Sequence, residues 1–253
     1  MKSRIFPSVM AKNQKELNAL LKKLQGSAEH LHLDIADGKF VPSRSLWFKF
    51  RLSSKFKYNA HLMINNPENW IKKYGKKVNL VIPQFETIQD VDKYVSRMKK
   101  VAFAIKPETS ISKLKPYLQH IDYVLVLTVH PGFYGAKFLK SPLKKIKQIK
   151  KINPKVRVIV DGGMNPKTIK SALKAGADYF VSGSFVSRSD NPKEAVGKLQ
   201  DLLNGPKYVS FGALKRRSGR RLDKLFLKIP KPPKKEEYLS LKEMKERLRK
   251  KRK

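Results

Sequence analysis

The sequence predicts a TIM (β/α)8 barrel followed by a basic C-terminal extension. Short apolar runs rich in β-branched residues alternate with longer amphipathic segments, which indicates βα units around a parallel sheet. Residues 1–205 hold eight such units, the number that closes a TIM barrel. The alternation stops at residue 206, so we expect a barrel domain over 1–205 and an appended segment over 206–253. A doubly wound open sheet is the alternative that the same alternation allows.

The predicted strands are short runs bounded by turn-forming residues, and they cover 4–9, 30–35, 58–64, 79–84, 101–106, 122–129, 156–161 and 178–183. The segments between them predict helices over 13–25, 66–74, 87–100, 111–119, 138–152, 165–176 and 191–203. Several of these helices start with Asn-Pro, in which Asn caps the helix and Pro takes its first position. Residues 44–57 should supply the helix after the second strand, although their pattern fits a helix less well than the others.

The composition predicts a globular protein of a reducing compartment. A chain of 253 residues with 40% apolar residues is long enough to bury a sizeable core. It has no cysteine, which excludes disulfides and thiolate metal sites and fits an intracellular setting. The N-terminal residues do not resemble a signal peptide, and no apolar run approaches membrane-spanning length. We therefore expect a cytoplasmic protein that does not bind membranes.

The charge is strongly basic, with 57 Lys and Arg residues against 20 Asp and Glu residues and a net charge of +37. Residues 206–253 carry 19 basic and 5 acidic residues, and residues 1–205 carry 38 and 15, so both parts are basic. This balance favours polyanions such as nucleic acid, and phosphorylated metabolites. A well-solvated, lysine-rich surface is the simpler interpretation. Within the tail, residues 240–253 fit a short basic helix, and we expect the rest to be partly disordered.

The stretch LHLDIADG (31–38) places one histidine and two aspartates in a strand that should be buried. Because strand side chains alternate, His32 and Asp34 share one face near the C-terminal end of that strand. His61 lies late in the third strand and Asp161 ends the seventh, so these side chains should meet at the rim where TIM barrels collect reactive groups. Two histidines and two carboxylates suit one divalent ion such as Zn, Fe(II), Mn or Co.

Each of these residues taken singly has a simpler explanation, because a polar residue at a strand end usually forms a structural hydrogen bond or a cap. The joint placement at one end of separate βα units favours the metal site instead. For Asp37, which precedes Gly38, we keep the structural interpretation and expect a turn residue.

Three glycine-containing loops predict a phosphate site. HPGFYGAKF (130–138), DGGM (161–164) and SGSF (182–185) follow the sixth, seventh and eighth strands. Glycine lets backbone N–H groups approach an anion, and the start of the following helix adds a favourable dipole. TIM barrels often bind phosphate at the loops after the last two strands.

Seven motifs that run from residue 5 to about 203 resemble, in order and spacing, those of the ribulose-phosphate 3-epimerase family. The motifs are PSVMAKN, LHLDIADGKFVPS, HLMINNPENW, AIKPETS, VLTVHPGFYGAKF, VDGGMNPKTI and VSGSFVSRSDNP. The resemblance implies a TIM barrel that interconverts D-ribulose 5-phosphate and D-xylulose 5-phosphate by inverting C3. This ketose-phosphate reaction belongs to the pentose phosphate pathway of carbohydrate metabolism.

The resemblance also implies roles for individual residues. It makes His32, Asp34, His61 and Asp161 the ligands of one divalent metal ion, which would stabilise an enediolate by binding the C2 and C3 oxygens. It makes Asp34 and Asp161 the acid and base on opposite faces of the substrate, because inversion cannot use one face alone. The residues implied to contact the substrate are Ser8, His61, Met63, Gly132, Gly135, Gly162, Gly163, Gly183 and Ser184.

Several positions depart from the family pattern. Ala36 stands where the family usually has Met, and Gln84 stands where His is common, with Glu86 kept two residues later. GFYGA introduces Tyr134 and Ala136 into the loop over the phosphate. The segment before His61 is a few residues short, and the basic tail has no counterpart. These departures bear on rate and substrate choice, and none removes a predicted ligand or base.

Two other functions stay open. The chain could be an epimerase of another ketose phosphate, such as allulose 6-phosphate, that uses the same ligands. It could also be an epimerase-like barrel whose tail binds nucleic acid weakly through KRRSGRR (215–221) and ERLRKKRK (246–253). A homo-oligomer is expected, and the apolar tail residues Tyr208, Phe211, Leu222, Leu225 and Phe226 allow the tail to pack on a neighbouring barrel.

Overall fold

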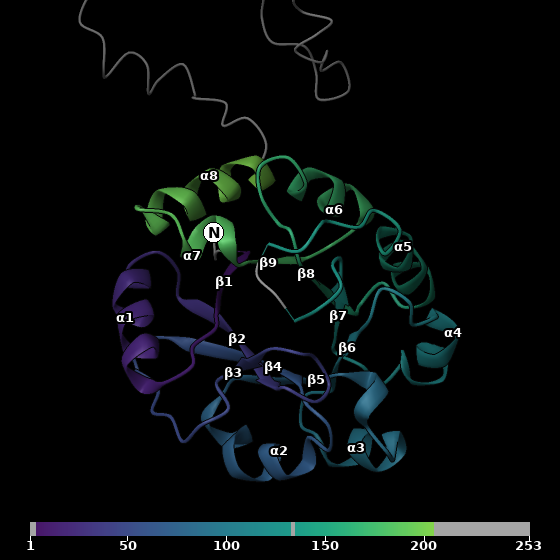
Figure 1. Ribbon diagram of the computed structural model, residues 1–253. Coiled ribbons are helices and arrows are strands. Elements are labelled where there is room, and N and C mark those ends of the chain that lie inside the picture. The colour runs from purple at the N-terminus through teal and green to yellow at the C-terminus, as the bar shows by residue number, and fades with distance from the viewer. Residues whose placement is uncertain (1–3, 133–134, 205–253) are drawn as a thin grey trace, which may run out of the picture. The chain divides into compact units, whose positions relative to one another are not determined.

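In the computed structural model, which describes residues 4–132 and 135–204, eight parallel strands form a barrel with helices around it (Figure 1). The strands follow the order β5-β4-β2-β1-β9-β8-β7-β6. The two ends of this path meet where Gln84, directly after β5, bridges Ala104 of β6 in parallel. The predicted TIM barrel is confirmed, and the open-sheet alternative is wrong. The predicted tail, 206–253, lies outside the described residues.

The barrel strands are β1 (Ile5–Val9), β2 (His30–Asp37), β4 (Lys57–Met63), β5 (Leu80–Pro83), β6 (Ala102–Ile105), β7 (Tyr123–Leu127), β8 (Arg157–Asp161) and β9 (Tyr179–Ser182). A two-residue strand, β3 (Arg44–Ser45), pairs antiparallel with the end of β2. The helices are α1 (Gln14–Leu24), α2 (Glu68–Tyr74), α3 (Val91–Arg97), α4 (Ile111–Leu114), α5 (Leu143–Ile152), α6 (Ile169–Ala175), α7 (Ser184–Ser187) and α8 (Pro192–Asn204). Short 3-10 turns are η1 (Gly75–Lys77), η2 (Phe85–Thr87) and η3 (Lys115–Tyr117).

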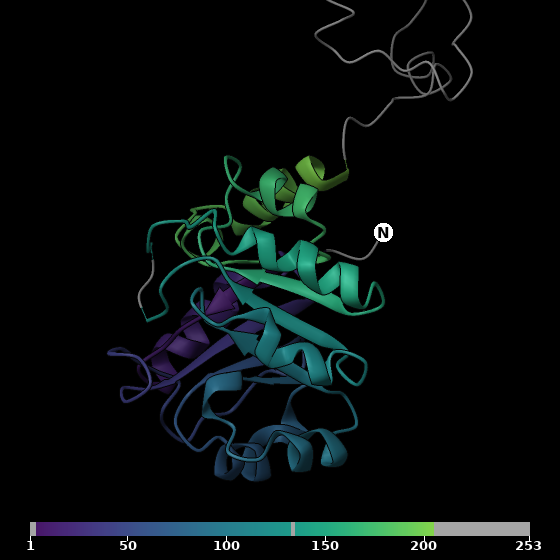
Figure 2. The same ribbon diagram turned by 90° about the vertical axis from the view of Figure 1, so that its right-hand side faces the viewer.

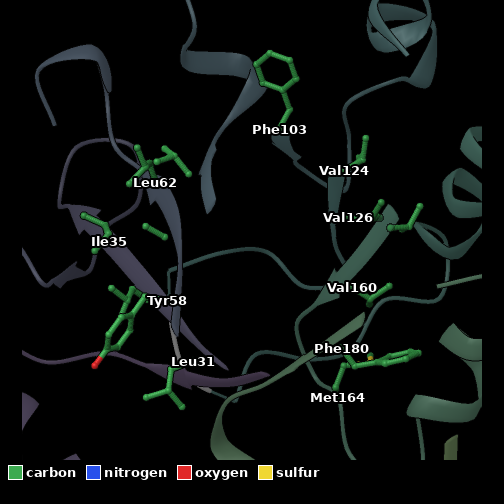
Figure 3. Packing of buried hydrophobic residues seen from close by; sticks show 14 of the residues in the cluster. Leu31, Ile35, Tyr58, Leu62, Phe103, Val124, Val126, Val160, Met164 and Phe180 are labelled. Atoms are coloured by element: carbon green, nitrogen blue, oxygen red, sulfur yellow. The ribbon is translucent and has the colours of Figure 1, made fainter. Parts of the chain in front are cut away.

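Alternation along the strands separates two layers of side chains. In β2, Leu31, Leu33 and Ile35 belong to the main core between strands and helices, whereas His32 and Asp34 face the barrel interior. Figure 3 shows members of the main core on strands from both halves of the barrel. A smaller apolar cluster is contributed by the strands that line the barrel, and its members include Phe6, Leu80, Ile82, Leu125, Ile159 and Val181. The barrel interior therefore holds both the polar side chains of β2 and this smaller apolar cluster.

The helix that we predicted within 44–57 is wrong. Apart from β3, these residues are irregular, and they run between α1 and α2 without a helix (Figure 1). Their exposure alternates, with Leu46 and Phe50 buried and Trp47, Lys49 and Arg51 exposed, so their apolar residues recur every two positions, not every three or four. One side of this segment is therefore buried although the segment forms no helix.

Helix starts agree with the Asn-Pro rule only in part. The Asn191 side chain accepts a hydrogen bond from the Glu194 N–H at 3.1 Å, and Pro192 takes the first position of α8, as predicted. In α2 the cap position is Pro67 and no side chain caps the helix, and α6 starts only after Thr168. Several helices are thus shorter than predicted, and the short helix α7 had no sequence signal. Figure 2 shows the same helices from the side of the barrel.

None of the helices within residues 4–132 and 135–204 has the length and apolar character needed to cross a membrane.

Replacement of Phe103 tests the packing of the outer core. Phe103 is fully buried on β6, and its ring packs edge-on to Phe85 at 5.4 Å and against Tyr94 at 5.0 Å. We expect Phe103→Ala to lower the free energy of unfolding by about 3–5 kcal/mol, because it leaves a cavity. Phe103→Leu, the matched control, should cost less than about 1.5 kcal/mol if neighbours repack. Urea unfolding measures both, and equal losses would contradict this account.

Candidate active site

Four polar side chains from three strands converge at one end of the barrel. His32 and Asp34 lie on β2, Asp34 is paired in register with His61 on β4, and Asp161 ends β8. His61 Nδ1 lies 3.4 Å from Asp34 Oδ1 and 3.5 Å from Asp161 Oδ2. His32 Nε2 lies 3.6 and 4.0 Å from the same two oxygens. The predicted meeting of these four residues is thus observed, with one ligand atom of each within 4.8 Å of the others.

These ligand atoms fit a divalent cation. The ring nitrogens of His32, Asp34 Oδ1 and His61 Nδ1 are buried, and none has a hydrogen-bond partner among the described residues. Buried polar atoms without partners are costly, and a metal ion at their common centre would satisfy them. Two imidazole nitrogens and two carboxylate oxygens are ligands that zinc and other first-row divalent ions accept. The cluster could therefore hold one metal ion.

Burial and charge shift the ionisation of the cluster in different directions. Burial alone would lower the pKa of His61, but Asp161 and Asp34 outweigh it and raise its pKa to about 9. Burial prevails at His32 and lowers its pKa. Burial alone would raise the pKa of Asp34, but both histidines and the Ser8 hydroxyl outweigh it, so its pKa is lowered. In the metal-free protein, the cation that the carboxylates require is therefore protonated His61.

Ser8 and Gln84 orient the ligands from outside the cluster. The Ser8 hydroxyl donates to Asp34 Oδ2 at 2.6 Å, which leaves Oδ1 directed at the cluster. The buried Gln84 side chain contacts His61 Nε2 at 2.8 Å. Both amide atoms find partners when the Gln84 oxygen accepts a hydrogen bond from His61 Nε2 and the Gln84 nitrogen donates one to Glu86 Oε2 at 2.9 Å. Glu86 is itself fixed, because its other oxygen accepts from the Lys106 N–H at 2.9 Å. An amide oxygen on Nε2 sets the His61 tautomer that exposes Nδ1 as a ligand.

Asp37 shapes the turn after β2, as predicted. Its Oδ1 accepts from the N–H groups of Lys39 and Phe40 at 2.8 and 2.9 Å, and its Oδ2 accepts from the Asn65 N–H at 2.9 Å. Partial burial would raise the pKa of Asp37, but these backbone hydrogen bonds outweigh it and lower it. Asp37 therefore uses its carboxylate for the loop and does not join the cluster.

A cavity of about 600 Å³ opens beside the cluster. Asp34 and Asp161 line it, whereas His32 and His61 are fully buried behind them. The other residues predicted to contact substrate also line it, namely Ser8, Met63, Gly132, Gly135, Gly162, Gly163, Gly183 and Ser184. Ser8 and Met63 lie on strands β1 and β4, and the other six residues follow β7, β8 and β9. His61, also predicted to contact substrate, is not among the residues that line the cavity.

Gly162 shows why the loop after β8 needs glycine. Its φ is +111°, and a Cβ there would lie 2.6 Å from Val129 Cγ2 and 3.0 Å from the Val129 nitrogen. Thr128 holds the same turn, because its hydroxyl donates to the carbonyls of Asp161 and Gly162 at 3.0 and 2.6 Å. The loop therefore positions the Asp161 carboxylate and the wall of the cavity together.

Sequence analysis missed several residues of the cavity. Met10 and Met164 line it, and so do the lysines Lys167 and Lys198, the basic side chains of its described lining. Met10 had a signal, because it lies two residues after Ser8 at the end of β1 and strand side chains alternate. Lys198 lies far along α8, and no sequence signal connects it to the site.

The residues that depart from the family pattern differ in burial and in their distance from the site. Ala36 is fully buried beneath Val41 and Met63, so apolar side chains from the following loop and from β4 cover that position. Ala136 lines the cavity, whereas Tyr134 lies outside the described residues. Gln84 contacts His61 of the cluster directly.

Removal of the Gln84 amide should weaken metal binding. Gln84→Ala leaves His61 Nε2 without its acceptor, so we expect a roughly 10–100-fold loss of affinity for Zn²⁺ or Mn²⁺ in the metal-stripped protein. Gln84→Glu, which keeps an acceptor oxygen, is the matched variant and should retain more affinity than Gln84→Ala. Competition with a fluorescent chelator measures both, and unchanged affinity in Gln84→Ala would rule out this positioning role.

Metal affinity should rise with pH. The pKa of His61 is raised to about 9, so below that pH a bound metal must displace one proton, and above it none. We expect the apparent affinity to increase about tenfold per pH unit between pH 6 and 8. Calorimetry in buffers of different ionisation enthalpy should detect about one proton released per metal ion bound at pH 7. Binding that does not change over this range would contradict the assignment.

Comparison with known proteins supports one family. The model of the ribulose-phosphate 3-epimerase family matches residues 4–187. The chain is 30% identical over 193 residues to the ribulose-phosphate 3-epimerase of Aquifex aeolicus, a match that covers 71% of this chain and 87% of that protein. It is 32% identical over 209 residues to that of Mycobacterium bovis, with coverage of 78% and 91%.

Solved structures share the fold at lower identity. KGPDC from Streptococcus mutans aligns with a TM-score of 0.54 at 10% identity, covering 81% of this chain and 98% of that one. Orotidine 5'-phosphate decarboxylase from Pyrococcus horikoshii aligns with a TM-score of 0.53 at 15% identity, with coverage of 80% and 100%. At these identities the likeness shows the barrel alone. The family match over most of the barrel and the position of the four clustered histidines and aspartates on its strands lead to one conclusion: the chain belongs to the ribulose-phosphate 3-epimerase family.

Proposed function

We propose that this protein interconverts D-ribulose 5-phosphate and D-xylulose 5-phosphate by inverting C3. The observation that carries the proposal is the pair Asp34 and Asp161, which lie on β2 and β8, separated by β1 and β9, and both line the cavity beside the ligand cluster. Inversion needs an acid and a base that reach opposite faces of one carbon, and these are the two carboxylates of the cavity's described lining. The chain's family supports the same reaction.

In this proposal the two aspartates exchange roles with the direction of reaction. One carboxylate takes the C3 proton from one face, and the other delivers a proton to the opposite face of the enediolate. A divalent ion held by His32, Asp34, His61 and Asp161 would supply Lewis-acid stabilisation of the negative charge that develops on the substrate oxygens. The lowered pKa of Asp34 means that its carboxylate is ionised and ready to accept a proton at neutral pH.

The phosphate of the substrate would lie at the glycine loops. Gly162 and Gly163 follow β8, Gly183 and Ser184 follow β9, and all four line the cavity, so their backbone N–H groups would be available to the phosphate. Lys167 and Lys198 line this cavity too and would add attraction for a dianion. A cavity of about 600 Å³ accommodates a pentose phosphate.

Another ketose phosphate is the second candidate substrate. Ala36 places a small side chain where the family usually has Met, and Ala136, another departure from the family pattern, lines the cavity. A longer sugar phosphate such as allulose 6-phosphate would use the same ligands and bases. Relative kcat/KM on a panel of ketose phosphates, each with and without chelator, distinguishes the two candidates.

Other expectations stay predictions. These are the identity of the metal (Zn, Fe(II), Mn or Co), a homo-oligomeric state, weak nucleic-acid binding by the tail, the domain boundary at residue 205 and a cytoplasmic location.

Replacement of either aspartate by asparagine should abolish epimerisation by removing one proton carrier. We expect kcat to fall by at least about 10²–10⁴-fold in Asp34→Asn and in Asp161→Asn. Each variant should still exchange the C3 proton of only one of the two epimers with D₂O, because the remaining carboxylate serves one face. NMR of both epimers measures this, with metal content determined in parallel to separate lost proton transfer from lost metal. Failure of the wild-type protein, supplied with metal, to exchange C3–H on any ketose phosphate would refute the function.

A further inference from the structure

A second concave surface lies on the outside of the barrel, where the expected helix within 44–57 is absent. It is a groove of about 880 Å³ between α1, residues 49–56, and the α2–η1 region. It shares no lining residue with the catalytic cavity. We refer to it as the outer groove.

The walls of the outer groove are held by specific contacts. The Gln14 side chain of α1 accepts from the Arg51 N–H at 2.9 Å and donates to the Arg51 carbonyl at 3.1 Å. The Tyr58 hydroxyl donates to the Ser53 carbonyl at 2.8 Å. The ring of Phe50 stacks on Tyr74 of α2 at 5.1 Å and 13°. These contacts hold the irregular segment 49–56 against both α1 and α2, so the walls of the groove have a defined structure.

All the charged side chains that line the outer groove are basic. Its basic side chains are Lys22, Lys49, Arg51, Lys55, Lys73 and Lys77, and no acidic side chain lines it within the described residues. None of these six forms an ion pair with another described residue, although four ion pairs between lysine, arginine or histidine and carboxylates outside the active site occur elsewhere. The Nζ atoms of Lys73 and Lys77 lie over the Tyr74 ring at 5.2 and 5.5 Å. Six like charges around one groove repel each other, and an anionic chain would relieve that repulsion.

An exposed aromatic residue, Trp47, lies two positions before Lys49 in the chain and is not itself a lining residue of the outer groove. Trp47 is 43% exposed, and it is the exposed large hydrophobic side chain of the described residues. Trp47, Lys49 and Arg51 alternate with the more buried Phe48 and Phe50, so the ring and the two cations lie on the outward side of one segment. Stacking on an aromatic ring together with cations along the backbone is how proteins hold single-stranded nucleic acid.

We propose that the outer groove binds single-stranded nucleic acid, with phosphates along its lysines and arginine and a base on Trp47. Other occupants fit less well. The tail, 206–253, carries 19 basic and 5 acidic residues, and a second barrel is also basic, so both would be repelled. An acidic peptide would match the charge but would leave the exposed indole without a stacking partner.

The test compares two full-length triple variants that lose the same charge. Lys49→Ala/Arg51→Ala/Lys55→Ala removes three cations from the outer groove, and the control Lys144→Ala/Lys147→Ala/Lys151→Ala removes three exposed cations from α5. Both keep the basic tail, so its contribution cancels. Fluorescence anisotropy with a labelled oligo-uridine of about 12 nucleotides, between about 50 and 200 mM salt, gives the affinity and its salt dependence. Urea unfolding and circular dichroism verify that each variant is folded.

We expect the groove variant to bind about tenfold more weakly and to lose about two from the slope of log affinity against log salt, because each lost phosphate contact contributes about 0.7. The α5 control should change affinity less than about twofold. Trp47→Ala should weaken binding about tenfold without altering the slope, and Trp47→Phe should recover part of the loss.

Equal losses in the two triple variants, or no loss in either, would overturn the proposal, because binding would then follow the tail or the net charge. A poly-glutamate peptide that competes as well as oligo-uridine at equal charge, together with an unaffected Trp47→Ala variant, would also overturn it in favour of an acidic protein partner. The result does not depend on the proposed epimerase substrate, because the outer groove and the cavity are separate.

Discussion

The structure depends on the balance of charge among four side chains at the end of the barrel. Asp34 and Asp161 place two carboxylates beside two fully buried imidazoles, with one ligand atom of each residue within 4.8 Å of the others. Carboxylates in such a position need a cation, which is the proton on His61 or a metal ion. Residues around the cluster direct each ligand atom inward, with Ser8 on one carboxylate and Gln84 on His61. The geometry of the site is therefore set by partners that do not themselves touch the centre.

Gln84 connects the site to the closure of the barrel. Its backbone bridges Ala104 and so joins the two ends of the sheet, while its amide joins His61 to Glu86. Its place immediately after β5 means that a shift in strand register would move the amide away from His61. A neutral amide can perform this task where the family commonly has a histidine, because an acceptor oxygen is all that a ligand imidazole needs on its second nitrogen.

The segment 44–57 shows what happens when one βα unit loses its helix. The apolar residues recur every second position, and the buried ones pack on the core where a helix was expected. A groove lies between α1, residues 49–56 and the α2–η1 region, and basic residues from all three line it. The absence of a helix in the second βα unit therefore coincides with a groove whose lining holds six basic side chains and no acidic one among the described residues.

The sequence by itself determined the order of strands, the alternation that places His32 and Asp34 inward, and the family that its motifs match. The strands and their inward-facing residues can be predicted from local patterns, because side-chain alternation and turn chemistry act over a few residues. It also identified Asp37 as a turn residue, since an aspartate before a glycine stabilises a turn through its own backbone neighbours.

Only the tertiary structure decided which side chains touch across the barrel. Residues that are distant in sequence meet at three places. Gln84 contacts His61, Lys198 of α8 lines the cavity, and the groove beside α1 is formed by three separate segments. No local pattern encodes such contacts, because they follow from how the strands close and where each helix packs. The departure at Ala36 is a further example, since Val41 and Met63 cover it only once the loop after β2 has folded over the barrel.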